Sequence, residues 1–106
     1  MSKIYDLDLL VEESITFKIG GEDIEIPSSP STALVIKIMK LEEKMKSVET
    51  PEEQMSLLAE IVALLLSQGE RKVTKKFIQD KFSMSQQRKV VDVFKSTMQG
   101  IEEDPN

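Results

Sequence analysis

The sequence predicts an α+β fold that is mainly helical, with an N-terminal β-hairpin followed by about four helices. Two short segments with alternating apolar residues flank a pair of glycines near the N-terminus. After them, apolar residues recur at helical spacing, and capping residues precede these runs. The chain has 106 residues, of which 40% are hydrophobic, so its length and composition fit one domain with a modest aliphatic core.

Residues 14–27 form the predicted hairpin. Ile15 and Phe17 share one face of the first strand, and Ile24 and Ile26 share one face of the second. The glycine pair between the strands accepts positive φ and suits a tight turn. A lone hairpin is only marginally stable in water, so its apolar face must lie against helices or against another chain.

The segment before the hairpin, residues 1–13, is predicted to be an N-terminal arm. Apolar and acidic residues alternate imperfectly over residues 4–12. A short strand and a loose arm both fit this pattern, and the choice between them stays open.

Residues 29–100 are predicted to form a helical bundle that makes one domain with the hairpin. Ser29-Pro30 opens the first helix, because Ser caps helices and Pro is tolerated at the first helical position. This helix ends near Val48. Its apolar stripe is formed by Leu34, Ile38, Leu41 and Met45, and is widened by Val35 and Met39.

The second predicted helix begins with a strong start signal. Thr50 is placed to cap it, Pro51 occupies its first position, and Glu53 is placed to close a capping box. The helix runs to about Gln68, and Gly69 is predicted to form a left-handed cap. Between these ends the helix is apolar on nearly all sides, which predicts burial on several sides.

Two further helices complete the predicted bundle. Thr74 caps the third helix, and Ser83 or Ser85 caps the fourth, which ends at Gly100. Residues 101–106 form an acidic tail. The side chains predicted to face the core are Phe77, Ile78 and Phe82 in the third helix and Val90, Val91, Phe94 and Met98 in the fourth.

The composition argues against enzyme chemistry. The chain has no Cys and no His, so thiolate nucleophiles and the commonest general base are excluded. Adjacent glutamates such as Glu52 and Glu53 point about 100° apart on a helix, so they do not converge on one substrate atom. Neither a phosphate loop nor a calcium loop is present. We therefore predict a non-catalytic protein without catalytic residues, cofactor or metal site.

The sequence also predicts a soluble protein of the cytoplasm with no membrane partner. The longest apolar run, residues 61–66, is far shorter than the roughly 18 residues of a membrane span. The N-terminus lacks the basic and apolar layout of a signal peptide.

Charge is distributed unevenly along the chain, whose net charge is −5. Residues 1–30 carry two basic and seven acidic side chains, whereas residues 71–100 carry eight basic and two acidic ones. The basic segment can dock on the acidic one within a single chain. It can also dock between chains, which predicts a salt-sensitive, head-to-tail homo-oligomer.

A helix-turn-helix is an alternative interpretation of residues 74–98. Its second helix begins Gln86-Gln87-Arg88-Lys89, side chains that suit base edges. Lys75, Lys76 and Lys81 are placed to contact phosphates. The turn lacks glycine and the flanking segments are acidic, so a DNA-binding regulator is the weaker prediction and nucleic acid is not the expected partner.

Three features indicate a protein that binds other polypeptides. The hairpin has unpaired edges, the second helix is more apolar than a small bundle needs, and six methionines offer adaptable packing surface. We therefore predict partner contacts from apolar residues of the hairpin and second helix and from basic residues of the last two helices. These residues are Ile15, Phe17, Ile24, Ile26, Leu57, Leu64, Lys75, Lys76, Lys81, Arg88 and Lys89.

The order of these parts resembles the small tail assembly chaperones of long-tailed, siphovirus-type bacteriophages and prophages of Gram-positive bacteria. The resemblance covers residues 14–99. It lies in the hairpin with its glycine pair, the Lys-Leu-Glu-Glu-Lys of residues 40–44, the leucine-rich second helix and the segment Gln86-Gln87-Arg88-Lys89-Val90-Val91-Asp92-Val93-Phe94. It assigns no role to an individual residue.

This resemblance implies a non-catalytic function. Such chaperones bind the long, largely helical tape measure protein, keep its apolar stretches from aggregating, and help to recruit subunits of the tail tube. They act in the cytoplasm of the bacterial host and leave before the tail is complete, so this chain is not expected in the mature virion. The implied partners are therefore the tape measure protein and the tail tube protein.

Overall fold

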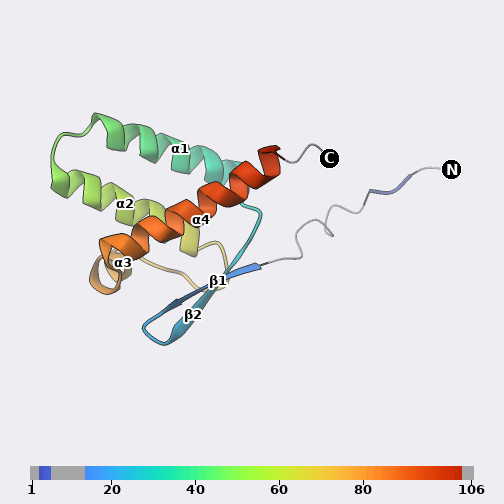
Figure 1. Ribbon diagram of the computed structural model, residues 1–106, viewed down its shortest axis with the longest axis horizontal. Helices are drawn as coiled ribbons and strands as arrows, with labels where there is room; N and C mark the ends of the chain where they lie inside the picture. The colour runs from blue at the N-terminus through green and yellow to red at the C-terminus, as the bar shows by residue number, and fades with distance from the viewer. Residues whose placement is uncertain (1–2, 6–13, 104–106) are drawn as a thin grey trace.

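A two-stranded antiparallel hairpin is followed by four helices in the computed structural model of the chain (Figure 1). This arrangement confirms the predicted α+β, mainly helical fold. The elements are β1 Ser14–Ile19, β2 Glu22–Pro27, α1 Thr32–Ser47, α2 Pro51–Leu66, α3 Lys75–Lys81 and α4 Met84–Glu103. The structure describes residues 3–5 and 14–103, with side chains described up to Thr97. Most of the predicted arm and residues 104–106 of the predicted acidic tail lie outside the described residues.

The hairpin forms as predicted, with its apolar face on the helices. Ile15 pairs with Ile26, and Phe17 pairs with Ile24. The two turn glycines have φ of 57° and 81°, the positive values that a two-residue type I′ turn requires. Ile24 and Ile26 are buried in the core, so helices of the same chain cover this face.

Helix α1 begins later than predicted. Ser31 caps it, because its Oγ accepts a hydrogen bond from the Leu34 N–H at 3.2 Å. Pro30 therefore lies before the cap rather than at the first helical position. Ile38 is buried, whereas Met39, which we expected to widen the apolar stripe, is 61% exposed. The reason is that α1 packs closely against α2 alone and buries only a narrow stripe.

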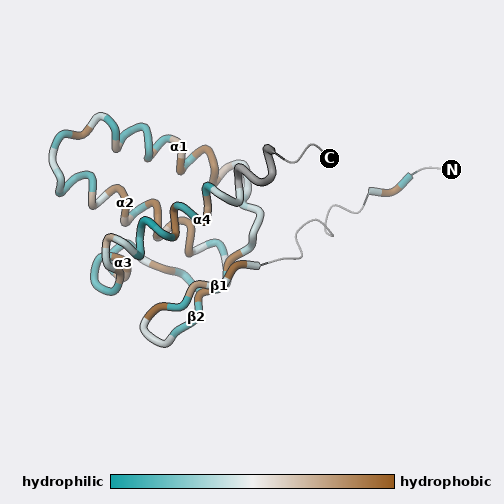
Figure 2. The backbone as a smooth tube through the Cα atoms, viewed as in Figure 1, coloured by the Kyte–Doolittle hydropathy of each residue, from teal (hydrophilic) through white to brown (hydrophobic). Residues whose placement is uncertain are grey.

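Helix α2 is the centre of the domain. Helix α1 ends before Val48, as predicted, and α2 follows Thr50, whose Oγ1 accepts from the Glu53 N–H at 3.3 Å. Helix α2 packs against α1, α3, α4 and β2, and Figure 2 shows hydrophobic residues along α2 and on both strands. Its buried residues confirm the predicted burial on several sides. They are Leu57, Leu58, Ala59, Ile61, Val62, Ala63, Leu65 and Leu66.

Gly69 permits a close backbone approach and does not form a left-handed cap. Helix α2 ends at Leu66 with Ser67 as its cap, and among the described residues only the two turn glycines have positive φ. The left-handed cap predicted at Gly69 is therefore wrong. A Cβ at this position would overlap the backbone oxygen of Glu25, so only glycine lets the segment after α2 pass β2 this closely.

Capping side chains begin the last two helices. The Thr74 Oγ1 accepts from the Phe77 N–H at 3.1 Å, as predicted. Ser83, rather than Ser85, caps α4, because its Oγ accepts from the Gln86 N–H at 3.2 Å. The Gln86 Oε1 in turn accepts from the Ser83 N–H at 2.7 Å. This reciprocal pair is a capping box.

Helix α4 continues past its predicted end. The helix runs to Glu103, so the stop predicted at Gly100 is wrong and the first residues of the predicted acidic tail are helical. Glycine lowers helix propensity by about 1 kcal/mol but does not prevent helical backbone angles. The Met98 side chain, predicted to face the core, lies outside the described residues.

The other side chains predicted to point inward from α3 and α4 contribute to one core with α2 and the hairpin. The buried ones are Ile78, Phe82, Val90 and Val91, and the partly buried ones are Phe77 and Phe94. Phe77 and Phe82 pack edge to face, with ring centroids 6.2 Å apart. The short α3 is therefore held against the core near its start by Phe77 and just after its end by Phe82.

Replacing Ser83 by Ala is expected to lower the free energy of unfolding by about 1 kcal/mol, because the Gln86 N–H loses its acceptor. Ser85→Ala is the matched control, since no hydrogen bond joins its hydroxyl to the backbone among the described residues. Urea unfolding followed by circular dichroism measures both variants. Equal losses in the two variants would contradict the assignment of Ser83 as the cap.

Candidate functional site

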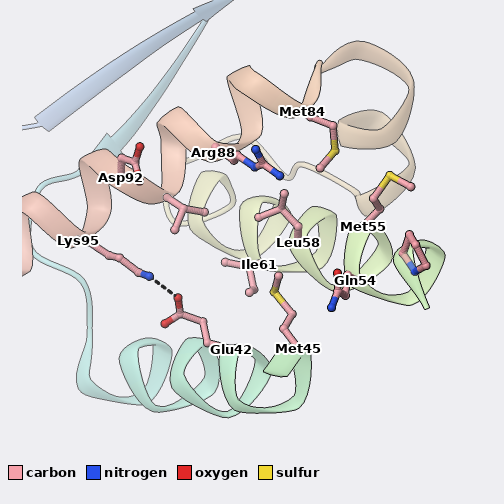
Figure 3. Close-up of a pocket in the computed structure, with 12 residues that line it drawn as sticks. Glu42, Met45, Gln54, Met55, Leu58, Ile61, Met84, Arg88, Asp92 and Lys95 are labelled. Carbon is pink, nitrogen blue, oxygen red and sulfur yellow. Dashed lines mark ion pairs between the residues drawn. The ribbon is translucent and has the colours of Figure 1, made fainter. Parts of the chain in front are cut away.

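An open groove lies between α1 and α4, with α2 as its floor (Figure 3). Its volume is about 500 Å³. We call it the methionine groove. Its lining residues are Glu42, Met45, Pro51, Gln54, Met55, Leu58, Ile61, Met84, Arg88, Val91, Asp92 and Lys95. It exists because α1 and α4 each pack closely on α2 and make few contacts with each other.

Three methionines from three different helices surround the floor of this groove. Figure 3 shows Met45, Met55 and Met84 around Leu58 and Ile61. The floor residues are buried, whereas Met55 is 44% exposed at the rim. Methionine side chains are unbranched and polarisable, so they adapt to apolar partners of varied shape. The groove therefore offers a deformable apolar surface that is open to solvent.

Charged side chains occupy the α1 and α4 walls. The Lys95 Nζ lies 2.8 Å from the Glu42 Oε2 and joins the two walls across the groove. Arg88 and Asp92 lie on the same wall of α4, and neither forms an ion pair among the described residues. The lining thus contains two acidic and two basic side chains. Because these charges balance, apolar contact rather than net charge would dominate binding in this groove.

The lining side chains provide contacts rather than a reactive centre. Leu58, Ile61 and Val91 supply apolar area, and Gln54 supplies an amide. Within residues 3–5 and 14–97, no group of three His, Cys, Asp or Glu side chains is placed to hold a metal ion. What this arrangement can do chemically is exclude water from an apolar side chain and accept or donate hydrogen bonds at its rim.

The apolar residues predicted to contact partners divide between core and surface. Ile24, Ile26 and Leu57 are buried, so the role predicted for them as partner contacts does not fit their position. Ile24 and Ile26 belong to the core cluster that the hairpin forms with the helices. Ile15 and Phe17 are partly buried on β1. Leu64 is half-buried and lines a separate shallow surface with Leu34 and Ile36 of α1.

The predicted basic contacts lie on two helices. Lys75, Lys76 and Lys81 are on α3, where Lys75 is half-buried and the other two are exposed. Arg88 and Lys89 are exposed on α4, but only Arg88 lines the methionine groove. Four of the five predicted basic residues therefore lie outside the methionine groove.

Gln87 does not fit the base-reading role that the helix-turn-helix interpretation requires. It is 5% exposed, and its Nε2 donates to the Phe82 backbone oxygen at 3.4 Å. Its Oε1 is buried without a hydrogen-bond partner. A side chain held in this way against the turn between α3 and α4 cannot reach a base edge.

Met84 lines the groove although it is not among the partner contacts predicted from the sequence. The apolar stripe of the first predicted helix includes Met45, whereas Met84 precedes the apolar residues predicted to face the core from the fourth helix. The signal that could have located it is the capping box of Ser83 and Gln86, which makes Met84 the first residue of α4. The meeting of three methionines from separate helices depends on tertiary packing.

No helix among the described residues is long and apolar enough to cross a membrane. The chain was compared with protein-family models, curated proteins and solved structures. None of these comparisons finds a match.

Proposed function

We propose that this protein is a non-catalytic assembly chaperone that binds an apolar helical segment of another polypeptide in the methionine groove. The observation that carries the proposal is the open, methionine-lined floor between α1 and α4. An amphipathic helix can lay its apolar face into such a groove, with anchors spaced at one-turn intervals. By its resemblance to phage tail assembly chaperones, the proposed partner is the tape measure protein, bound in the host cytoplasm.

The chemistry of the groove supports a reversible hold on varied apolar segments. Met55 already exposes apolar area to water, so covering it is favourable by about 25 cal/mol for each Å² removed from solvent. Glu42, Arg88, Asp92 and Lys95 keep the walls solvated when no partner is bound. A chaperone that must later release its partner needs this combination of adaptable apolar floor and charged rim.

Replacing Met55 by Lys is expected to reduce capture of the tape measure protein at least tenfold, because a charge would be desolvated against the apolar floor. The assay co-expresses the tagged chain with the tape measure protein from the same phage genome and quantifies the soluble complex. Met39→Lys is the matched control, since Met39 is 61% exposed on α1 and does not line the groove.

This experiment separates the site from the general function. If both methionine variants capture the tape measure protein as well as the natural chain does, the groove is not the binding site. If the natural chain leaves the tape measure protein insoluble and unbound, the proposed chaperone function fails.

A DNA-binding regulator remains the alternative proposal, supported by the exposed Lys76, Lys81 and Lys89 on α3 and α4. The acidic net charge and the buried Gln87 weigh against it. A gel shift with random duplex DNA at low salt is expected to show no complex. A complex that disappears when Arg88 and Lys89 are both replaced by Ala would favour the regulator instead.

A further inference from the structure

The outer edge of β1 carries backbone groups that bond to nothing in the described part of the chain. The hairpin turn has two residues, so the pair that flanks it exchanges hydrogen bonds, and such pairs alternate along antiparallel strands. Ile15 and Phe17 therefore bond to β2, whereas the N–H and C=O groups of Thr16 and Lys18 point away from it. Among the described residues, no backbone hydrogen bond beyond the β1–β2 ladder involves either strand, so the two outer edges differ in what lies against them and not in hydrogen bonding.

The outer edge of β2, in contrast, is covered by the segment between α2 and α3. Gly69 approaches the backbone oxygen of Glu25, which is the residue that pairs with Thr16. The Arg71 Nη2 also lies 3.2 Å from the Glu22 Oε2 on the same strand. Within residues 3–5 and 14–103, the hairpin thus has one edge that another segment covers and one edge that no segment covers.

The apolar face of β1 is also incompletely covered. Ile24 and Ile26 on β2 are 1% and 6% exposed, so β2 lies over the centre of the core. The inward residues of β1 are only partly buried. A narrow crevice separates these β1 residues from α4. On the α4 side it is lined by three half-buried residues, Val93, Phe94 and Thr97. The outer edge of β1 therefore lies at the border of the core, where apolar side chains are still partly exposed to solvent.

We propose that β1 of a second copy of this chain pairs with the open edge, antiparallel and related by a two-fold axis at Thr16. A two-fold interface brings the same residues together from both copies. Thr16 then faces Thr16 of the second copy, Ser14 faces Lys18, and about six backbone hydrogen bonds form between the strands. The result is a four-stranded sheet in the order β2-β1-β1-β2.

The side chains of β1 are complementary in this register. On the inner face, Ile15 of each copy lies opposite Phe17 of the other, an aromatic and β-branched pair that stabilises antiparallel strands. On the outer face, two threonines meet at the axis, and each Lys18 lies opposite a serine. An axis at Lys18 would instead place two like charges opposite each other, which is unfavourable. Shifting one strand by one residue against the other would instead place the apolar side chains of one copy opposite polar side chains of the other.

The symmetric sheet differs from the head-to-tail association that the charge distribution suggests. Its contacts are backbone hydrogen bonds and apolar pairs, so it should persist at high salt. It shares no residue with the methionine groove and does not rest on the proposed chaperone function.

The test uses charges placed on the two-fold axis. Analytical ultracentrifugation of the natural chain is expected to show a dimer with a dissociation constant below about 1 mM. Thr16→Lys and Thr16→Glu should each weaken the dimer at least tenfold at low salt, because like charges then meet at the axis. An equimolar mixture of the two variants should restore dimerisation, because opposite charges meet. Thr16 is exposed, so neither change disturbs the core, and circular dichroism verifies the fold.

Three results would overturn the proposal. The first is a natural chain that stays monomeric at millimolar concentration. The second is a dimer whose affinity both Thr16 variants leave unchanged, which would place the interface elsewhere. The third is a mixture of the variants that dimerises no better than either variant alone, which would exclude a two-fold axis at this residue.

Discussion

Leu65→Ala is expected to lower the free energy of unfolding by about 2–5 kcal/mol. Leu65 is fully buried on α2, in the core cluster to which the hairpin and the other helices contribute. Removing its isobutyl group loses apolar burial and leaves a cavity, because helices packed on several sides of α2 cannot all move inward. Small domains are stable by only about 5–15 kcal/mol, so this loss is a large part of the total.

Leu64→Ala is the matched control, because the same change is made one position away on the same helix. Leu64 is only half-buried beside α1, so its truncation is expected to cost clearly less than that of Leu65. Urea unfolding with a common slope measures the difference. Equal losses would mean that α2 is not oriented as described.

Gly69→Ala is expected to destabilise the protein by about 1–3 kcal/mol through overpacking. The added Cβ would overlap the backbone oxygen of Glu25, and both colliding groups are backbone-anchored, so neither can rotate away. Gly69 does not have a positive φ, so without this contact the same substitution would stabilise the protein by about 0.4–1 kcal/mol. Whether Gly69→Ala lowers or raises the free energy of unfolding therefore tests whether residue 69 lies against the backbone of Glu25.

Thermal unfolding gives this sign directly, and amide hydrogen exchange locates the effect. The N–H groups of β2 should exchange faster in the Gly69 variant, because the segment that covers the strand is pushed away. An unchanged or raised midpoint of unfolding would show that the segment after α2 does not pass this close to β2.

The parts of the fold that follow from neighbouring residues were predictable from the sequence. The caps at Thr50 and Thr74 depend on a side chain and an N–H three residues apart, so the sequence contains both partners. The hairpin depends on two adjacent glycines and on alternation in the flanking strands. Because these patterns involve residues close together in the sequence, they can be recognised without knowing how the helices and strands pack.

The errors arose where one residue type has several structural uses. Glycine permits a left-handed cap, a close backbone approach or simple helical continuation, and only the neighbouring strand shows which applies at Gly69. Met39 fits a helical stripe, but α1 has a single close neighbour and leaves it exposed. The groove formed by Met45, Met55 and Met84 depends on distances between helices, which spacing along the chain does not contain.

The central position of α2 has a consequence for folding during synthesis. The hairpin and α1 emerge from the ribosome before residues 51–66, yet α2 provides the surface on which both β2 and α1 pack. A nascent chain that ends before Pro51 would therefore expose its isoleucines to the surrounding solution and remain sensitive to proteases. Resistance to proteolysis should appear only once this central helix has left the exit tunnel.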